Sequence, residues 1–326
     1  MRHSRKILAA LLGLLGILSL VPPTSAEVRF LGYTDVAGPG YNHLGEIAGN
    51  GAGTNVAFVN FAVDWTQTDL AAALRDFQGA GLRAALLLDN VLFRRFPAGD
   101  SSRCVDPQGR FVTRLRANWG SRLASFARAH GSRINPGTTL FIVVQTEVNN
   151  TCTALGDVED AAVAIKGYFP GIPVVMGYGR SPGAQPAPAS IPPDVDWVGF
   201  YKYGTYDPAD PGHPWNADDQ YLAEFQDLLG KLADHQRVLL GPDAFWATFL
   251  HAHLNSQNGP GTGWPRWYLQ YVALNYERFA LAQPKVVGMF LYRWSDRDAD
   301  LIGTANLPRA VRARHQEIGC RNLGCP

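Results

Sequence analysis

The stretch of residues 139–147 reads TLFIVVQTE, an apolar run that ends in a carboxylate. A short apolar run bounded by polar residues is typical of a strand buried on both faces, as in parallel sheets. Seven other strand-like runs occur along the chain, and each also ends in polar or aromatic residues. Because these groups all follow strands at the same end, the pattern predicts a parallel barrel with its site at the C-terminal mouth.

The alternation of strands with helices predicts a single-domain α/β fold, a (β/α)8 TIM barrel spanning residues 27–326. The predicted strands cover residues 28–33, 55–61, 83–88, 139–145, 173–177, 195–200, 237–240 and 285–291. Helices are expected at residues 68–79, 115–130, 158–168, 218–234, 265–282 and 307–318. We expect Asp157 to be the N-cap of the third helix, and a polar loop containing Cys104 to lead into the second.

The N-terminus carries the features of a secretory signal peptide. Arg2, Arg5 and Lys6 precede an apolar run over residues 7–21, and Thr24-Ser25-Ala26 supplies small residues for cleavage after Ala26. The alternative, a membrane anchor, is less favoured because the run is short for a hydrocarbon core of about 30 Å. The expected location of the mature chain is therefore secreted or periplasmic.

The net charge gives no reason to expect a nucleic-acid-binding or membrane-binding protein, and the cysteines indicate disulfides rather than a zinc site. The leader contains three of the 29 basic residues and none of the 28 acidic ones, so the remaining chain has a formal charge of −2. Such a balance gives no general reason to bind nucleic acid or a membrane surface. Export makes disulfides plausible, and of the three possible connectivities we favour Cys104 with Cys152 and Cys320 with Cys325. No CxxC spacing indicates a zinc site.

The residues at the predicted strand ends are mainly carboxylates and aromatics. The sequence shows no cluster of histidine ligands, no GxSxG elbow, no phosphate-binding loop and no GxGxxG fingerprint. Carboxylates for proton transfer beside flat aromatic faces suit a neutral polyhydroxylated ligand. The set comprises Asp35, Asp64, Asp89, Glu147, Tyr178, Tyr201, Tyr203, Asp243, Tyr292 and Trp294.

A Glu after the fourth strand, a carboxylate after the seventh and a Trp after the eighth resemble the clan A glycoside hydrolases, which are (β/α)8 barrels with retaining chemistry. The resemblance implies that Glu147 is the general acid/base and that Asp243 is the nucleophile. It also implies that Tyr201, Tyr203 and Trp294 contact the sugar.

The chain departs from the clan pattern at two positions. Thr146 stands before the acid/base where clan members usually have Asn, and Asp243 stands where they usually have Glu. The shorter Asp could place the carboxyl groups beyond the roughly 5.5 Å of a retaining pair and admit a water, which would give inversion. Alternatively, the second carboxylate is another residue, such as Asp89 or Asp296.

The sequence thus predicts a secreted glycoside hydrolase that cleaves an oligo- or polysaccharide by a two-carboxylate mechanism. We expect no cofactor and a monomer. Besides Glu147 and Asp243, the expected substrate-binding residues are Asp35, Asp89, Asn149, Tyr178, Tyr201, Tyr203, Tyr292 and Trp294.

Two other functions compete with hydrolysis by two carboxylates. The first is a barrel that keeps the sugar cleft but has lost the chemistry, an option raised by the Asp at the seventh strand. Each carboxylate also has a structural alternative: Glu147 pairs with Arg180 or Arg293, and Asp243 is a turn residue or helix cap. The second is a metal-dependent hydrolase or deacetylase built on His251, His253 and an Asp, although an isolated HxH lacks the third ligand that metal sites normally have.

Overall fold

The computed structural model describes residues 27–38, 41–49, 53–60, 67–97, 111–179, 190–201, 219–242, 244, 246–247, 266–291, 293–296 and 301–324. The expected signal peptide, residues 1–26, lies outside this set and stays a prediction. None of the helices within the described ranges is long and apolar enough to span a bilayer.

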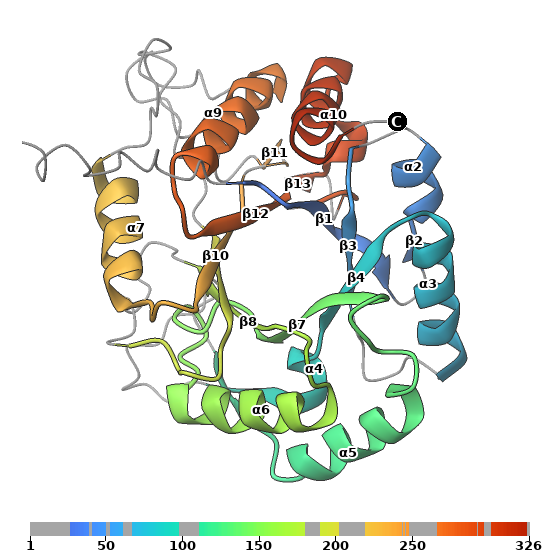
Figure 1. Ribbon diagram of the computed structural model, residues 1–326, viewed down its shortest axis with the longest axis vertical. Coiled ribbons are helices and arrows are strands. Elements are labelled where there is room, and N and C mark those ends of the chain that lie inside the picture. Colours follow the sequence, from blue (N-terminus) through green and yellow to red (C-terminus); the bar gives the residue numbers. More distant parts are fainter. Residues whose placement is uncertain are drawn as a thin grey trace, which may run out of the picture.

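Eight parallel strands form a closed barrel, as the sequence predicts (Figure 1). The barrel closes where the first strand pairs with the last, from Phe30 opposite Gly288 to Tyr33 opposite Leu291. Continuous apolar runs produce this fold because each strand is covered on the inside by the barrel core and on the outside by helices. The strands are β1 (Phe30–Gly38), β3 (Val56–Asn60), β4 (Arg83–Leu87), β7 (Thr139–Gln145), β8 (Val174–Gly179), β9 (Trp197–Tyr201), β10 (Arg237–Leu240) and β12 (Val286–Leu291).

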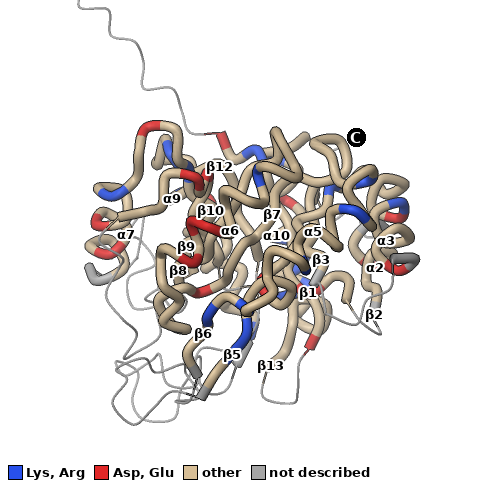
Figure 2. The backbone as a smooth tube through the Cα atoms, turned by 90° about the horizontal axis from the view of Figure 1, so that it is seen from below, with Lys and Arg blue, Asp and Glu red and all other residues tan. Residues whose placement is uncertain are grey.

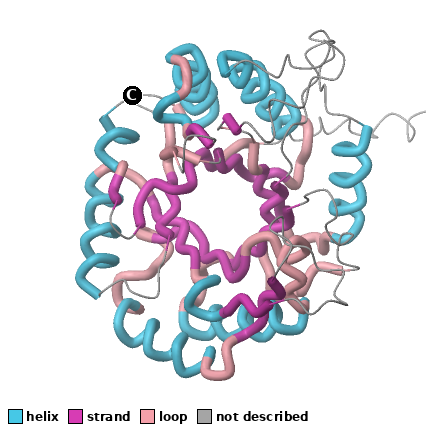
Figure 3. Tube along the Cα trace, turned by 180° about the vertical axis from the view of Figure 1, so that it is seen from behind, coloured by secondary structure: helices cyan, strands magenta, loops and turns pink. Residues whose placement is uncertain are grey.

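Helices surround the strands as an outer ring (Figure 3). The six predicted helices are all present, with ends shifted by a few residues. Asp157 is not an N-cap: it lies in the first turn of its helix, and its carboxylate accepts a hydrogen bond from the backbone N–H of Leu115 at 3.2 Å. The helices are α2 (Leu44–Gly49), α3 (Gln67–Gly79), α5 (Trp119–His130), α6 (Leu155–Tyr168), α7 (Asp219–Lys231), α9 (Leu269–Leu281) preceded by η1 (Arg266–Tyr268), and α10 (Arg309–Leu323) preceded by η2 (Thr304–Asn306).

A β-hairpin stands where the sequence predicted only a polar loop. After the short helix α4 (Asp89–Leu92), β5 (Phe93–Pro97) pairs in antiparallel register with β6 (Phe111–Leu115). The prediction was wrong because two successive arginines in FRRFP hide the alternation that marks a strand. Two smaller additions are β2 (Tyr41–Asn42), which pairs with β1, and β11 (Trp246–Ala247), which pairs with β13 (Leu301–Ile302).

Aromatic rings fill the lower part of the barrel interior. Phe58, Phe141 and Phe290 meet edge to face, with centroids 4.9 to 5.7 Å apart. Trp197 lies beside them, 5.7 Å from Phe141, and stacks on Phe30 at 5.5 Å. Such pairs add to the area that each ring buries. The interior is therefore a packed core rather than an open channel.

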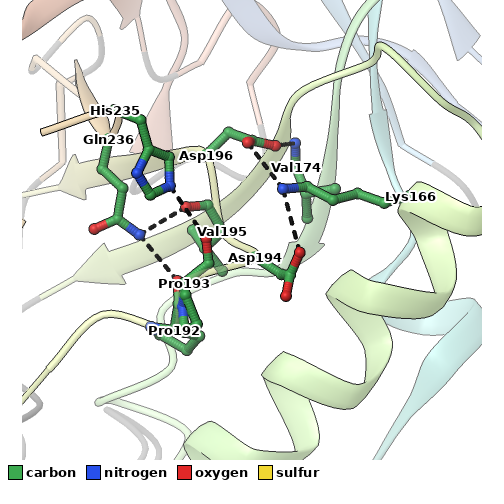
Figure 4. A network of polar contacts seen from close by, with 9 residues as sticks. All are labelled: Lys166, Val174, Pro192, Pro193, Asp194, Val195, Asp196, His235 and Gln236. Carbon is green, nitrogen blue, oxygen red and sulfur yellow. Dashed lines mark hydrogen bonds and ion pairs between the residues drawn. The ribbon is translucent and has the colours of Figure 1, made fainter. Parts of the chain in front are cut away.

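Charged and amide side chains tie the lower ends of the strands to one another and to α6 (Figure 4). Lys166 on α6 lies 3.0 Å from Asp196, whose other carboxylate oxygen accepts the backbone N–H of Val174 at 2.8 Å. The buried amide of Gln236 donates to the carbonyls of Pro192 and Val195. These contacts sit at the N-terminal ends of β8, β9 and β10, the face of such barrels that serves stability.

The last helix docks on the first strand through a buried polar contact. His315 of α10 is 1% exposed, and its Nδ1 lies 3.0 Å from the hydroxyl of Tyr33 on β1. Backbones also meet closely here, because a Cβ on Gly319 would lie within 2.7 Å of Gly53. Cys152 and Cys320 are both disulfide-bonded, whereas Cys104 and Cys325 lie outside the described residues, so the expected pairing stays a prediction.

The buried histidine predicts a pH-dependent stability. Burial lowers the pKa of His315 to about 4, whereas an exposed histidine titrates near 6.5. The neutral ring therefore stabilises the fold fully above about pH 6.5, and on the order of 3 kcal/mol is lost as the pH falls to about 4. Denaturant unfolding of wild type and His315→Gln at pH 7 and pH 4.5 should show a smaller loss in the variant. The exposed His235 provides the control: His235→Gln should lose as much unfolding free energy between pH 7 and pH 4.5 as wild type does. An equal loss in all three proteins would contradict this account.

Candidate active site

Glu147 follows β7 in a backbone conformation that few residues other than glycine adopt. Its φ is +49°, in the left-handed region. The loop holds it there, because the carbonyl of Glu147 accepts the backbone N–H groups of Asn150 and Thr151 at 2.9 and 3.0 Å, and the Thr151 hydroxyl at 3.1 Å. A residue in this region costs about 1–3 kcal/mol, and such conformations cluster at functional sites. The backbone thus fixes the direction in which the carboxylate leaves the strand.

The carboxylate of Glu147 lies over the end of the neighbouring strand. A Cβ on Gly179 would come within 2.9 Å of Glu147 Cγ, so only glycine leaves room there. Asn150 donates its side-chain amide to Glu147 Oε2 at 3.2 Å. Asn149 joins the same turn to β8, because its Oδ1 accepts the Gly179 N–H at 3.1 Å. The buried Nδ2 of Asn149 makes no hydrogen bond within the described residues.

The ring of Tyr201 lies inside the mouth across three glycines of successive strands. A Cβ on Gly177 would lie 2.8 Å from Tyr201 Cε2, one on Gly199 would lie 2.5 Å from the hydroxyl, and one on Gly241 would overlap Cδ1. The Cε2 edge of the Tyr201 ring, next to Gly177, also faces the backbone of Glu147. Burial raises the pKa of Tyr201, and the nearby negative charge of Glu147 raises it further. The hydroxyl therefore stays protonated at any physiological pH.

Asp89 lies beside Glu147 at the end of the adjacent strand β4. Its carboxylate accepts the Asn90 backbone N–H at 2.6 Å and the Thr146 hydroxyl at 3.3 Å. Burial raises the pKa of Asp89, although these two hydrogen bonds and the charge of Arg95 act in the opposite direction. Thr146, which stands in place of the clan's usual Asn, thus joins the two carboxylate-bearing strand ends.

Two other candidate carboxylates are held by neighbours on the far side of the mouth. Asp35, whose φ is +54°, pairs with Arg293 at 3.0 Å, so Arg293 is engaged there. Asp296 accepts the Gly303 N–H at 2.7 Å and the Asn306 amide at 2.8 Å. Asp296 therefore braces the chain that follows β12.

Tyr178 and Trp294 lie in the layer between strands and helices. Tyr178 is 1% exposed and stacks on Phe200, with centroids 5.8 Å apart. Trp294 is 3% exposed; it meets Tyr33 edge to face and donates its indole N–H to Glu46 at 2.7 Å. Both side chains are part of the outer core, and their expected contact with a sugar stays a prediction.

Several expected site residues lie outside the described residues and stay predictions, namely Asp64, Arg180, Tyr203, Asp243, His251, His253 and Tyr292. No three His, Cys, Asp or Glu side chains of the described ranges are grouped as metal ligands would be. Asn150 and the glycines next to Tyr201 are site residues that position at a strand end does not reveal. Gly177 and Gly199 inside apolar strands, and Gly241 directly after one, were the available signal, because such glycines mark a close approach.

The chain matches no protein-family profile and no curated protein. Among solved structures it is similar to a GH113 β-1,4-mannanase, at 13% identity over 90% of this chain and 99% of that one, with a TM-score of 0.53. The GH113 mannanase AaManA from Alicyclobacillus acidocaldarius, in complex with ManMIm, is 11% identical over 90% and 98%, with a TM-score of 0.51. A β-glucuronidase from Ruminococcus gnavus is 12% identical over 90% of this chain and 50% of that one, with a TM-score of 0.52.

At these identities the likeness shows the fold alone. All three proteins are glycoside hydrolases of clan A with (β/α)8 barrels, so the distant resemblance expected from the sequence is confirmed at the level of architecture.

The packing around Tyr201 predicts a coupling that stability measurements can detect. Gly241→Ala should destabilise the protein by about 1–3 kcal/mol, because the added methyl group overlaps the ring. In a Tyr201→Ala background the same change should cost at least about 1 kcal/mol less. The control is Gly230→Ala on α7, where no heavy atom lies within 4 Å of the new methyl group. Denaturant midpoints of the four-protein cycle measure the coupling, and additive effects would refute the contact.

Proposed function

We propose that this protein is a secreted glycoside hydrolase that cleaves an oligo- or polysaccharide, with Glu147 as the general acid/base. The observation that carries the proposal is the placement of the Glu147 carboxylate. A strained backbone turn, a glycine on the next strand and the amide of Asn150 together direct it at the mouth of the barrel. Barrels of this kind carry out their chemistry at that face.

Hydrolysis needs a second carboxyl group on the other side of the scissile bond. Asp243 is our candidate, because it follows the end of β10 and stands two residues after Gly241 in the sequence. The ring of Tyr201 reaches from the backbone of Glu147 to Gly241, so it joins the two strand ends that would carry the pair. Glu147 would protonate the leaving oxygen while Asp243 attacks the anomeric carbon or activates water.

Neutral donors and acceptors near Glu147 suit the hydroxyl groups of a sugar. The protonated hydroxyl of Tyr201 can donate to a developing negative charge without adding charge of its own. The buried Nδ2 of Asn149 is a second donor in the same turn. We assign Asp89 and Asp35 to sugar hydroxyls, since Asp89 follows the end of β4 and Asp35 lies in β1 just past the stretch that pairs with β12. No step in this mechanism requires a cofactor.

Replacing the proposed acid tests the proposal directly. Glu147→Gln should lower kcat on a susceptible glycan by about 10²–10⁴-fold, because an amide cannot transfer the proton. Affinity for the same glycan, measured by calorimetry, should be nearly unchanged. Glu317→Gln, on the exposed face of α10, is the matched control and should keep full activity. Full activity in Glu147→Gln would exclude this residue as the acid, and binding without hydrolysis in wild type would favour the non-catalytic barrel.

A second pair of variants identifies the partner carboxylate. Asp243→Ala should lose activity, and added azide should restore turnover by attacking the anomeric carbon in place of the carboxylate. NMR of the glycosyl azide should show the anomeric configuration opposite to that of the substrate. Asp296→Ala is the comparison, since Asp296 is already bound to Gly303 and Asn306. Loss of activity in Asp296→Ala alone would reverse the assignment.

A further inference from the structure

The β5–β6 hairpin and the strand ends beside it enclose a small polar pocket at the rim of the barrel. Figure 2 shows the hairpin at one end of the molecule, with basic residues on both of its strands. The pocket encloses about 90 Å³ and is lined by Arg94, Arg95 and Arg116, by the hydroxyl residues Thr113 and Thr151, and by the strand-end residues Thr146 and Asp89. It will be called the arginine pocket.

The positive charge of the arginine pocket is not balanced by ion pairs with the carboxylates of the described residues. Within the described chain, none of the three guanidinium groups forms an ion pair with a carboxylate. The Nε of Arg116 is buried without a hydrogen-bond partner, and its Nη2 reaches only the carbonyl of Asn90 at 3.2 Å. Burial lowers the pKa of Arg116, and the nearby charges of Arg122 and Arg94 lower it further. Arg94 and Arg95 are exposed and Arg116 is half-buried, so their guanidinium groups are accessible to an anion from solvent.

Among the described lining residues Asp89 is the one carboxylate, and its single charge does not cancel the three cations. Its oxygens are occupied by the Asn90 N–H and the Thr146 hydroxyl, and Arg95 lies near enough to lower its pKa without forming an ion pair. Guanidinium groups beside hydroxyl donors are the usual partners of carboxylate, sulfate and phosphate oxygens.

The position of the arginine pocket connects it to the proposed chemistry. Thr146 immediately precedes Glu147, and the hydroxyl of Thr151 donates to the Glu147 carbonyl. The pocket is small, about 90 Å³, which suits a charged group carried on a larger ligand. The ligand would therefore be a substituent on a sugar that lies in the mouth.

We propose that the arginine pocket binds an anionic substituent of the substrate, so that this protein acts on acidic rather than neutral glycans. The substituent is a carboxylate, as in a uronic acid, or a sulfate or phosphate ester, which offer the same oxygens to the arginines. The substrate class rests on the proposed function, whereas anion binding by the pocket does not.

Binding tests the pocket without any need for hydrolysis. Calorimetry on the full chain with glucuronate, glucose 6-sulfate, glucose 6-phosphate and glucose should give at least tenfold tighter binding of one or more anions than of glucose. The preferred anion distinguishes carboxylate from ester. Arg95→Gln and Arg94→Gln should each weaken that binding at least threefold. The control is Arg114→Gln, an exposed residue of the same hairpin that does not line the pocket; it should leave binding unchanged.

Hydrolysis then tests the substrate class. We expect kcat/KM for a polysaccharide containing uronic acid, or its sulfated or phosphorylated counterpart, to exceed that for the carboxyl-reduced or ester-free form at least tenfold. Arg95→Gln should reduce this ratio, and Arg114→Gln should not. Anion binding without hydrolysis of any glycan would support the anion site in the arginine pocket and contradict the proposed function. Hydrolysis of neutral and acidic glycans at equal rates, with no anion binding, would overturn the inference and leave the proposed function standing.

Discussion

The parallel pairing of β1 with β12 is the contact on which the rest of this structure depends. It joins residues that are more than 250 positions apart in the sequence and turns an open sheet into a closed barrel. Closure forces the inward side chains to share one interior, which five aromatic rings fill from below. It also brings the ends of β4, β7, β8, β9 and β10 to one rim. Asp89, Glu147 and Tyr201 are neighbours only for that reason.

The strands could be predicted well from the sequence because a parallel barrel buries both faces of each strand. The resulting apolar runs are hard to confuse with loops, and β7 and β10 begin and end at the predicted residues. The β5–β6 hairpin escaped prediction because β5 carries two consecutive exposed arginines. Its hydrophobic signal is therefore weak, although its backbone pairing is regular.

The site was predicted less completely, for a reason that lies in strand geometry. Position at a strand end indicates the rim, but successive side chains point to opposite faces, so position alone does not decide which side chains enter the mouth. On β8, Gly177 faces the interior while Tyr178 packs outward against Phe200. The backbone turn at Glu147 is also invisible in the sequence, because loop hydrogen bonds rather than local propensity impose it.

The ring of Tyr201 packs against three glycines that lie in or directly after three neighbouring strands. Residues 177, 199 and 241 lack side chains because one aromatic group occupies the space of all three. Evolution can therefore enlarge any of them only by first shrinking residue 201. Homologous chains should exchange volume between these positions as a set, and the floor of the barrel mouth would change shape in discrete steps rather than gradually.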